Sequence, residues 1–203
     1  MEKVRYGGWE NCYRLVNEQI ELIITADVGP RIIRFGFIGQ NNMFKEYSEE
    51  MGKTDSEEWL IFGGHRLWHA PEAIPRTYYP DLDPVLIQET EGGLIATQKP
   101  EPTTGLQKQI EINMAKDRPE VQLTHRLINH NLWSVETAPW ALSVMAQGGT
   151  AILPLPPRGP HPQFLLPTST LSIWPYTDLG DERWTLGERF ILLNQDPEIS
   201  RPQ

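Results

Sequence analysis

The chain has 203 residues, enough for one sizeable hydrophobic core, and it carries a formal net charge of -9. Its 18 Lys and Arg residues are scattered rather than clustered, which argues against nucleic acid and anionic membranes as partners, because neutralising phosphates requires grouped cations. A neutral, polar small molecule is a better match for a negatively charged protein with scattered cations.

The N-terminal segment and the cysteine content indicate a cytoplasmic protein without disulfides. Residues 1–6 carry charges where a signal peptide has an apolar run of about 7 to 15 residues. No stretch approaches the ~18 apolar residues of a membrane span. Cys12 is the single cysteine, so it cannot form an intrachain disulfide, and it is expected to be a small buried residue.

Short runs of β-branched and aromatic residues, separated by prolines and glycines, predict an all-β fold of antiparallel strands. Residues 19–25 alternate with a period of two, and a Gly-Pro turn leads into a second strand at residues 31–38. Residues 85–89 and 93–98 repeat this hairpin pattern around a Gly-Gly turn. The acidic stretch 46–58 is interpreted as a solvated loop or a short helix.

A third predicted hairpin carries two polar side chains on apolar faces. Its strands, residues 106–114 and 121–128, are separated by a polar turn that contains a proline. If the strand ends next to the turn pair with each other, His125 lies opposite Ile110 and Lys108 is a diagonal neighbour at about 7 to 8 Å. A histidine on such a face is more often a core residue whose ring nitrogens are hydrogen-bonded within the protein. An inward lysine beside it, however, favours a polar cleft.

The last third of the chain is expected to continue the same domain, which we predict to span residues 1–203. Residues 133–146 predict a long strand, in which Pro139 indicates a sheet edge or a bulge. A Gly-Gly turn then leads to a short strand at residues 151–153. The proline-rich residues 154–162 predict an extended loop, a long surface excursion or an internal boundary.

The densest group of polar and aromatic residues follows two glycines and includes Arg66, Trp68, His69 and Glu72. Such a mixture is typical of sugar-binding sites, because an aromatic face stacks on the C–H side of a pyranose while charged groups hydrogen-bond its hydroxyls. We expect these four side chains to line one hollow. The alternative is that Trp68 belongs to the core and its charged neighbours only solvate a loop.

The same segment allows a metal site as an alternative. His65, His69 and Glu72 have the side chains of metal ligands, and the spacing of the two histidines would place them on one helical face. The preceding glycines and Pro71 oppose such a helix. No metal and no other cofactor is therefore expected.

Six blocks of the sequence stand in an order that resembles a known family. The most specific block is Gly-Gly-His-Arg-Leu-Trp followed by Pro-Glu, at residues 63–72. The family is an uncharacterised one that is similar to the aldose 1-epimerases, or galactose mutarotases, and the resemblance covers roughly residues 5–195. It implies an antiparallel β-sandwich, the galactose-mutarotase-like supersandwich, with a carbohydrate cleft on a concave face. The other blocks are residues 11–15, 29–32, 104–108, 125–129 and 138–142.

The resemblance also implies a pair of catalytic residues. In the epimerases a histidine on a central strand is the acid and a C-terminal glutamate is the base, because opening the ring protonates its oxygen and removes the anomeric proton. The corresponding strand here, at residues 137–144, has no histidine, and the C-terminal glutamate strand is not found. We therefore expect a trimmed or C-terminally truncated relative, with His69 and Glu72 as the remaining acid and base.

The predicted function is carbohydrate binding with aldose 1-epimerase-type isomerase activity at a sugar anomeric centre. The alternatives are a non-catalytic carbohydrate-binding or sensor module and an inactive truncated relative. The tryptophans outside the cleft, Trp59, Trp133 and Trp174 among them, are interpreted as packing residues. The side chains expected to bind the sugar are Arg66, Trp68, Lys108, His125 and Trp140.

Overall fold

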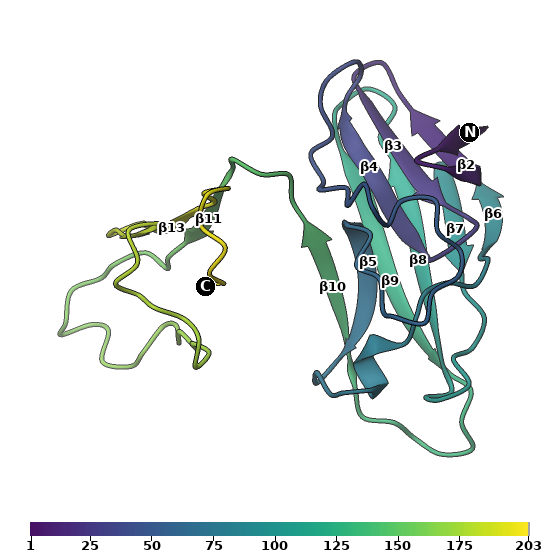
Figure 1. Cartoon of the computed structure of the whole chain (residues 1–203). Coiled ribbons are helices and arrows are strands. Elements are labelled where there is room, and N and C mark those ends of the chain that lie inside the picture. Colours follow the sequence, from purple (N-terminus) through teal and green to yellow (C-terminus); the bar gives the residue numbers. More distant parts are fainter. Residues whose placement is uncertain (203) are drawn as a thin grey trace. The chain divides into compact units, whose positions relative to one another are not determined.

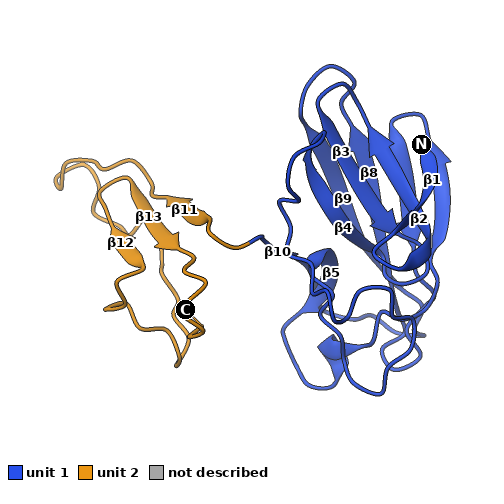
Figure 2. Ribbon diagram, turned by 45° about the horizontal axis from the view of Figure 1, so that its top comes forward, with its two compact units in different colours: residues 1–146 blue, residues 147–203 orange. Residues whose placement is uncertain are grey.

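The structure is a computed structural model that describes residues 1–202. The chain divides into two compact units, Met1–Ala146 (unit 1) and the residues from Gln147 onward (unit 2), which are described separately (Figure 2). The single domain expected over the whole chain stays a prediction, because compactness alone does not decide whether the units fold independently. In the described residues, no helix is long and apolar enough to cross a membrane.

Unit 1 consists of two antiparallel sheets, so the all-β prediction is confirmed (Figure 1). The six-stranded sheet contains, in pairing order, β1 (Glu2–Tyr6), β2 (Trp9–Val16), β3 (Ile20–Thr25), β4 (Arg31–Phe37), β5 (Gly64–Ala70) and β10 (Ala138–Val144). The four-stranded sheet contains β6 (Leu86–Thr90), β7 (Gly93–Thr97), β8 (Leu106–Met114) and β9 (Val121–Asn129), and a 3₁₀ turn, η1 (Arg76–Tyr78), precedes it.

The two sheets of unit 1 pack face to face as a β-sandwich (Figure 1). Alternate side chains of each strand point inward, as the period of two predicts, and they form one continuous core. The six-stranded sheet and the four-stranded sheet both contribute to it. The buried members are Leu15, Leu22, Ile24, Ile32 and Leu67 from the first sheet and Leu94, Ala96, Ile110 and Ile112 from the second.

The six-stranded sheet is also covered on its outer face. Residues 46–62 cross this face as a loop, and Phe62 packs there against Trp9 and Ile23. The Trp9 indole nitrogen donates a hydrogen bond of 3.0 Å to the Lys53 carbonyl. The acidic stretch is therefore a loop, as one of the two interpretations predicted, but it also shields a second apolar cluster.

The three predicted hairpins are present, formed by β3 with β4, β6 with β7 and β8 with β9. The register of the last pair is the expected one, since Met114 pairs with Val121 and Ile110 with His125. The strand that contains Pro139 is shorter than predicted and forms an edge of its sheet. A proline is tolerated there because an edge strand does not need every backbone donor.

Unit 2 contains a three-stranded sheet. Its strands are β11 (Thr150–Pro154), β12 (Trp184–Leu186) and β13 (Phe190–Asn194), in the order β11-β13-β12. The predicted strand at residues 151–153 exists, but it pairs with β13 rather than returning along β10. Trp174 in this unit has 58% of its surface exposed, so its interpretation as a packing residue is wrong.

Candidate functional site

Two glycines determine where β5 begins. Gly63 and Gly64 have positive φ angles of 93° and 70°. A Cβ atom at these positions would lie 1.9 Å from the Lys45 carbonyl oxygen and 2.3 Å from the Ile32 carbonyl oxygen. Only glycine fits both the conformation and the space. The polar and aromatic segment that follows is consequently held as a strand between β4 and β10.

Because this segment is a strand, its side chains alternate between the two faces of the sheet. Leu67 belongs to the core between the sheets, and His65 on the same face reaches His125 of β9. Arg66 and Trp68 lie on the other face, where they contact Trp59 from the covering loop. The structure thus divides between two faces the side chains that the sequence was expected to place in one hollow.

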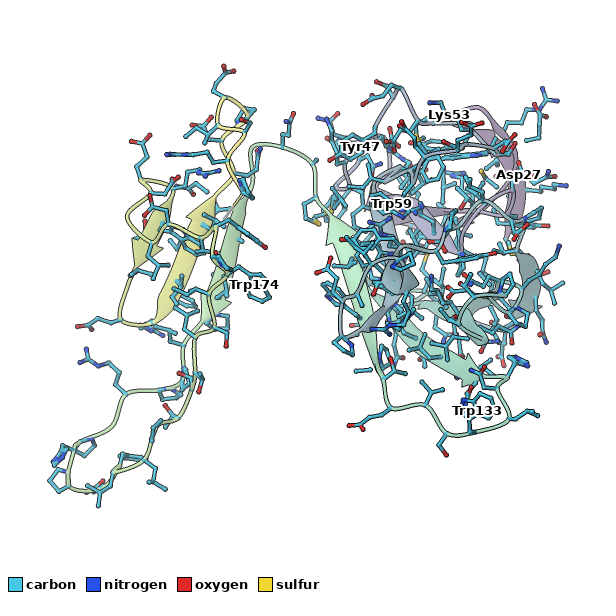
Figure 3. The ribbon with its side chains drawn as sticks, turned by 60° about the horizontal axis from the view of Figure 1, so that its bottom comes forward. Asp27, Tyr47, Lys53, Trp59, Trp133 and Trp174 are labelled. Carbon is cyan, nitrogen blue, oxygen red and sulfur yellow. The ribbon has the colours of Figure 1, made fainter. Side chains whose placement is uncertain are left out.

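Four aromatic side chains gather on the outer face, and we call Trp59, Trp68, Tyr78 and Trp140 the ring cluster (Trp59 is labelled in Figure 3). Trp68 is its centre, with ring centroids at 5.8 Å from Trp59, 4.9 Å from Tyr78 and 5.5 Å from Trp140, all edge to face. Trp68 is only 5% exposed, whereas the other three rings are half-buried. The cluster therefore presents three aromatic side chains to solvent around a buried fourth.

Arg66 lies next to the ring cluster. Its guanidinium carbon is 4.6 Å from the centroid of Trp59 and 4.4 Å from that of Trp68, within the range of cation–π interactions. The side chain is buried, and its Nε and Nη1 atoms have no hydrogen-bond partner among residues 1–202. Burial lowers the pKa of Arg66 to about 10, so the group stays charged at neutral pH.

Glu72 is exposed and follows the end of β5. It accepts a hydrogen bond from the hydroxyl of Tyr78, a member of the ring cluster. This hydrogen bond raises the pKa of Tyr78 above its ordinary value, with burial adding to the effect. The Glu72 carboxylate therefore stands beside the aromatic side chains, on the solvent side.

His69 lies on the opposite face of β5 from Trp68 and is fully buried. Its two ring nitrogens have no hydrogen-bond partner in the described part of the chain, and burial lowers its pKa. Glu72, its expected catalytic partner, is exposed and engaged with Tyr78. The structure does not bring this predicted acid and base together.

Lys108 is also buried, and its charge is paired inside unit 1. Its ammonium nitrogen lies 2.8 Å from Glu101 and 3.2 Å from Asp81, and Asp81 is also 3.8 Å from Arg31. Burial alone would lower the pKa of Lys108, but the two carboxylates raise it above the ordinary value. The ammonium group of the inward lysine therefore binds two carboxylates of the protein, whereas its position near His125 had favoured an open polar cleft.

His125 forms a direct contact between the two sheets of unit 1. Its Nε2 atom lies 2.8 Å from Nε2 of His65, whose Nδ1 atom is 2.8 Å from the Ser143 hydroxyl. Burial lowers the pKa of His65 to about 4, with the nearby charges of His125 and Arg31 adding to the effect, and burial also lowers that of His125. At neutral pH one ring therefore donates its proton to the other.

A pocket of about 270 Å³ adjoins this histidine pair. Its walls are mainly apolar, and His65 and Ser143 are the polar residues that line it. The pocket lies on the inner side of the sheet, away from the ring cluster. The remaining lining residues are Leu22, Ile32, Phe35, Met43, Phe44, Val121, Leu123 and Met145.

The metal alternative finds no support in the arrangement of these residues. Within residues 1–202, no group of three or more His, Cys, Asp or Glu side chains is suited to hold a metal ion. His65 and His69 are four residues apart on a strand, which separates their Cα atoms by roughly 13 Å. The spacing that suits one helical face therefore does not converge here.

Trp59 was not expected in the site, because it was interpreted as a packing residue without polar neighbours that converge on it. Tyr78 follows the polar and aromatic segment in the sequence, in the turn η1, but it was not among the predicted sugar-binding residues. Trp133, interpreted in the same way, is 71% exposed, so that interpretation is wrong. Figure 3 shows Trp133 at one end of unit 1, apart from Trp59.

Comparison of the chain with protein-family models, with curated proteins and with solved structures finds no match in any of the three. The resemblance to the aldose 1-epimerases therefore stays a prediction.

Proposed function

We propose that unit 1 binds a carbohydrate at the ring cluster, on the outer face of β5 and β10. The observation that carries this proposal is the presence of three half-buried rings, Trp59, Tyr78 and Trp140, around the buried Trp68. Flat aromatic side chains that are partly shielded from water complement the C–H face of a pyranose. Their grouping on one surface gives a sugar ring more than one contact.

Polar groups beside the rings support the same proposal. Arg66 provides buried donors, Glu72 provides an exposed carboxylate acceptor and the Tyr78 hydroxyl can donate or accept. A sugar site combines apolar stacking with a few polar groups of this kind, which fix the orientation of the hydroxyls.

The arrangement favours a binding module over the isomerase. Interconversion of anomers needs an acid and a base that both reach one sugar ring. His69 points between the sheets and Glu72 stands outside them, so a sugar on the ring cluster would meet only the carboxylate. We therefore propose binding without acceleration of mutarotation.

Saturation-transfer NMR on the full chain with glucose and galactose tests the binding. We expect saturation of the sugar C–H protons in the wild-type protein and its loss in Trp140→Ala, since Trp140 is half-buried on the edge strand. Trp133→Ala is the matched control and should bind as the wild type does. Equal binding by Trp140→Ala and the wild type would show that the ring cluster is not the site.

Polarimetry of freshly dissolved glucose and galactose separates binding from catalysis. We expect the optical rotation to relax at the rate of the buffer alone in the presence of the protein. An acceleration that disappears in Glu72→Gln would establish the isomerase and overturn the binding-only proposal.

A further inference from the structure

Arg66 brings to the ring cluster a positive charge that has no acidic partner among residues 1–202. The residue is 4% exposed, and the described residues offer no hydrogen-bond acceptor to its Nε and Nη1 atoms. A buried ionic group is normally paired or hydrogen-bonded, because burial without a partner is costly. Contact with Trp59 and Trp68 offsets only part of this cost.

The carboxylates that influence Arg66 electrostatically are already engaged elsewhere. Asp81 forms ion pairs with Lys108 and Arg31. Glu50 accepts a hydrogen bond from the backbone nitrogen of Phe62. Both attract the guanidinium from a distance without binding it. Among the described residues, the positive charge of Arg66 therefore has no carboxylate bound to it.

A carboxylate matches this charge better than a phosphate does. One carboxylate neutralises one guanidinium, and the planar geometries of the two groups are complementary. A phosphate monoester would bring close to two negative charges to a cluster whose Tyr78 hydroxyl is already bonded to the Glu72 carboxylate. The second charge would meet repulsion there.

We infer that the ligand of unit 1 is an acidic sugar that carries one carboxylate, of the uronic acid class, and that Arg66 binds this carboxylate beside the ring cluster. The inference rests on the proposed carbohydrate site and specifies its substrate class. It also revises the preference for a neutral ligand that the overall negative charge favours.

Isothermal titration calorimetry of the full chain with matched sugars tests this inference. The series compares glucuronate with glucose, galacturonate with galactose, and each uronate with its neutral methyl ester. A charge-assisted hydrogen bond predicts that the uronates bind at least about tenfold more tightly than the neutral sugars and esters. The preference should weaken as the salt concentration rises.

Variants locate the charge that is responsible. Arg66→Met keeps an unbranched apolar stem against the indoles and should remove the preference for uronates. Arg126→Gln, on β9, removes an exposed arginine that pairs with Glu111 and should keep the preference. If Arg66→Met does not fold, the wild-type ligand series still decides, because the methyl esters remove the same charge from the ligand.

The outcomes separate this inference from the proposed function. Equal affinity for uronates, esters and neutral sugars would overturn the inference and leave the carbohydrate site standing. Tighter binding of glucose 6-phosphate than of glucuronate would overturn the choice of a carboxylate. Absence of binding by every sugar in the series would overturn the proposed function itself.

Discussion

Acidification is expected to destabilise unit 1 through the histidine pair that joins its sheets. The pKa of His65 is about 4 in the folded protein, whereas a histidine in an unfolded chain titrates near its ordinary value of about 6.5. Below that ordinary value the unfolded chain binds more protons than the folded one. Stability is therefore unaffected above about pH 6.5 and falls as the pH decreases towards 4.

The size of the effect follows from the difference between the two pKa values. Each pKa unit corresponds to about 1.4 kcal/mol. His65 alone therefore lowers the free energy of unfolding by about 3 kcal/mol once the pH has fallen below 4. About 2 kcal/mol of this is lost by pH 5, before most carboxylates become protonated. His125, whose pKa is also lowered, changes stability in the same direction.

Urea unfolding followed by tryptophan fluorescence, at intervals between pH 7.5 and pH 5, measures this dependence. The free energy of unfolding should decrease across this range in the wild-type protein, and the decrease should be much smaller in His65→Gln. His130→Gln, which removes an exposed histidine, should retain the wild-type slope. A wild-type stability that does not change between pH 7.5 and pH 5 would refute the neutral, proton-sharing pair.

Urea unfolding at pH 7.5 can measure three further substitutions. Two of them are expected to destabilise the protein, and one is expected to be neutral or to stabilise it. Lys108→Met should cost about 3 to 5 kcal/mol, because it leaves the buried carboxylates of Glu101 and Asp81 without their ammonium partner; a loss below about 1 kcal/mol would contradict this. His69→Leu should be neutral or stabilise the protein by about 1 kcal/mol, since it removes two unpaired buried nitrogens, and marked destabilisation would indicate a hidden partner. Gly64→Ala should cost about 2 kcal/mol or more, since the added methyl group meets a carbonyl at positive φ, and a wild-type midpoint would disprove that constraint.

The strand pairs near turns could be predicted from the sequence because local rules determine them. Alternation with a period of two and glycine or proline at the turns located three hairpins, and pairing the strand ends next to the turn gave the register of β8 with β9. Pro139 indicated a sheet edge or a bulge, and β10 is an edge strand. These features depend on neighbouring residues, so one sequence is sufficient to find them.

The composition of the site could be predicted only in part. Arg66 and Trp68 were expected together, and they do lie together. The side chains of this segment were all expected to line one hollow. The segment is instead a strand, so His69 lies on the other face of the sheet. Trp59 reaches the site from a loop, and the partners of Lys108 come from distant segments. Contacts of this kind depend on tertiary packing, which no local pattern records.

The position of Pro139 has a consequence for what can approach β10. An edge strand offers unpaired backbone groups to which another polypeptide can add as an extra strand, and such additions lead to aggregation. Proline provides no amide hydrogen, so it interrupts the row of donors directly beside Trp140. Growth of the sheet is thereby discouraged along the strand that carries Trp140.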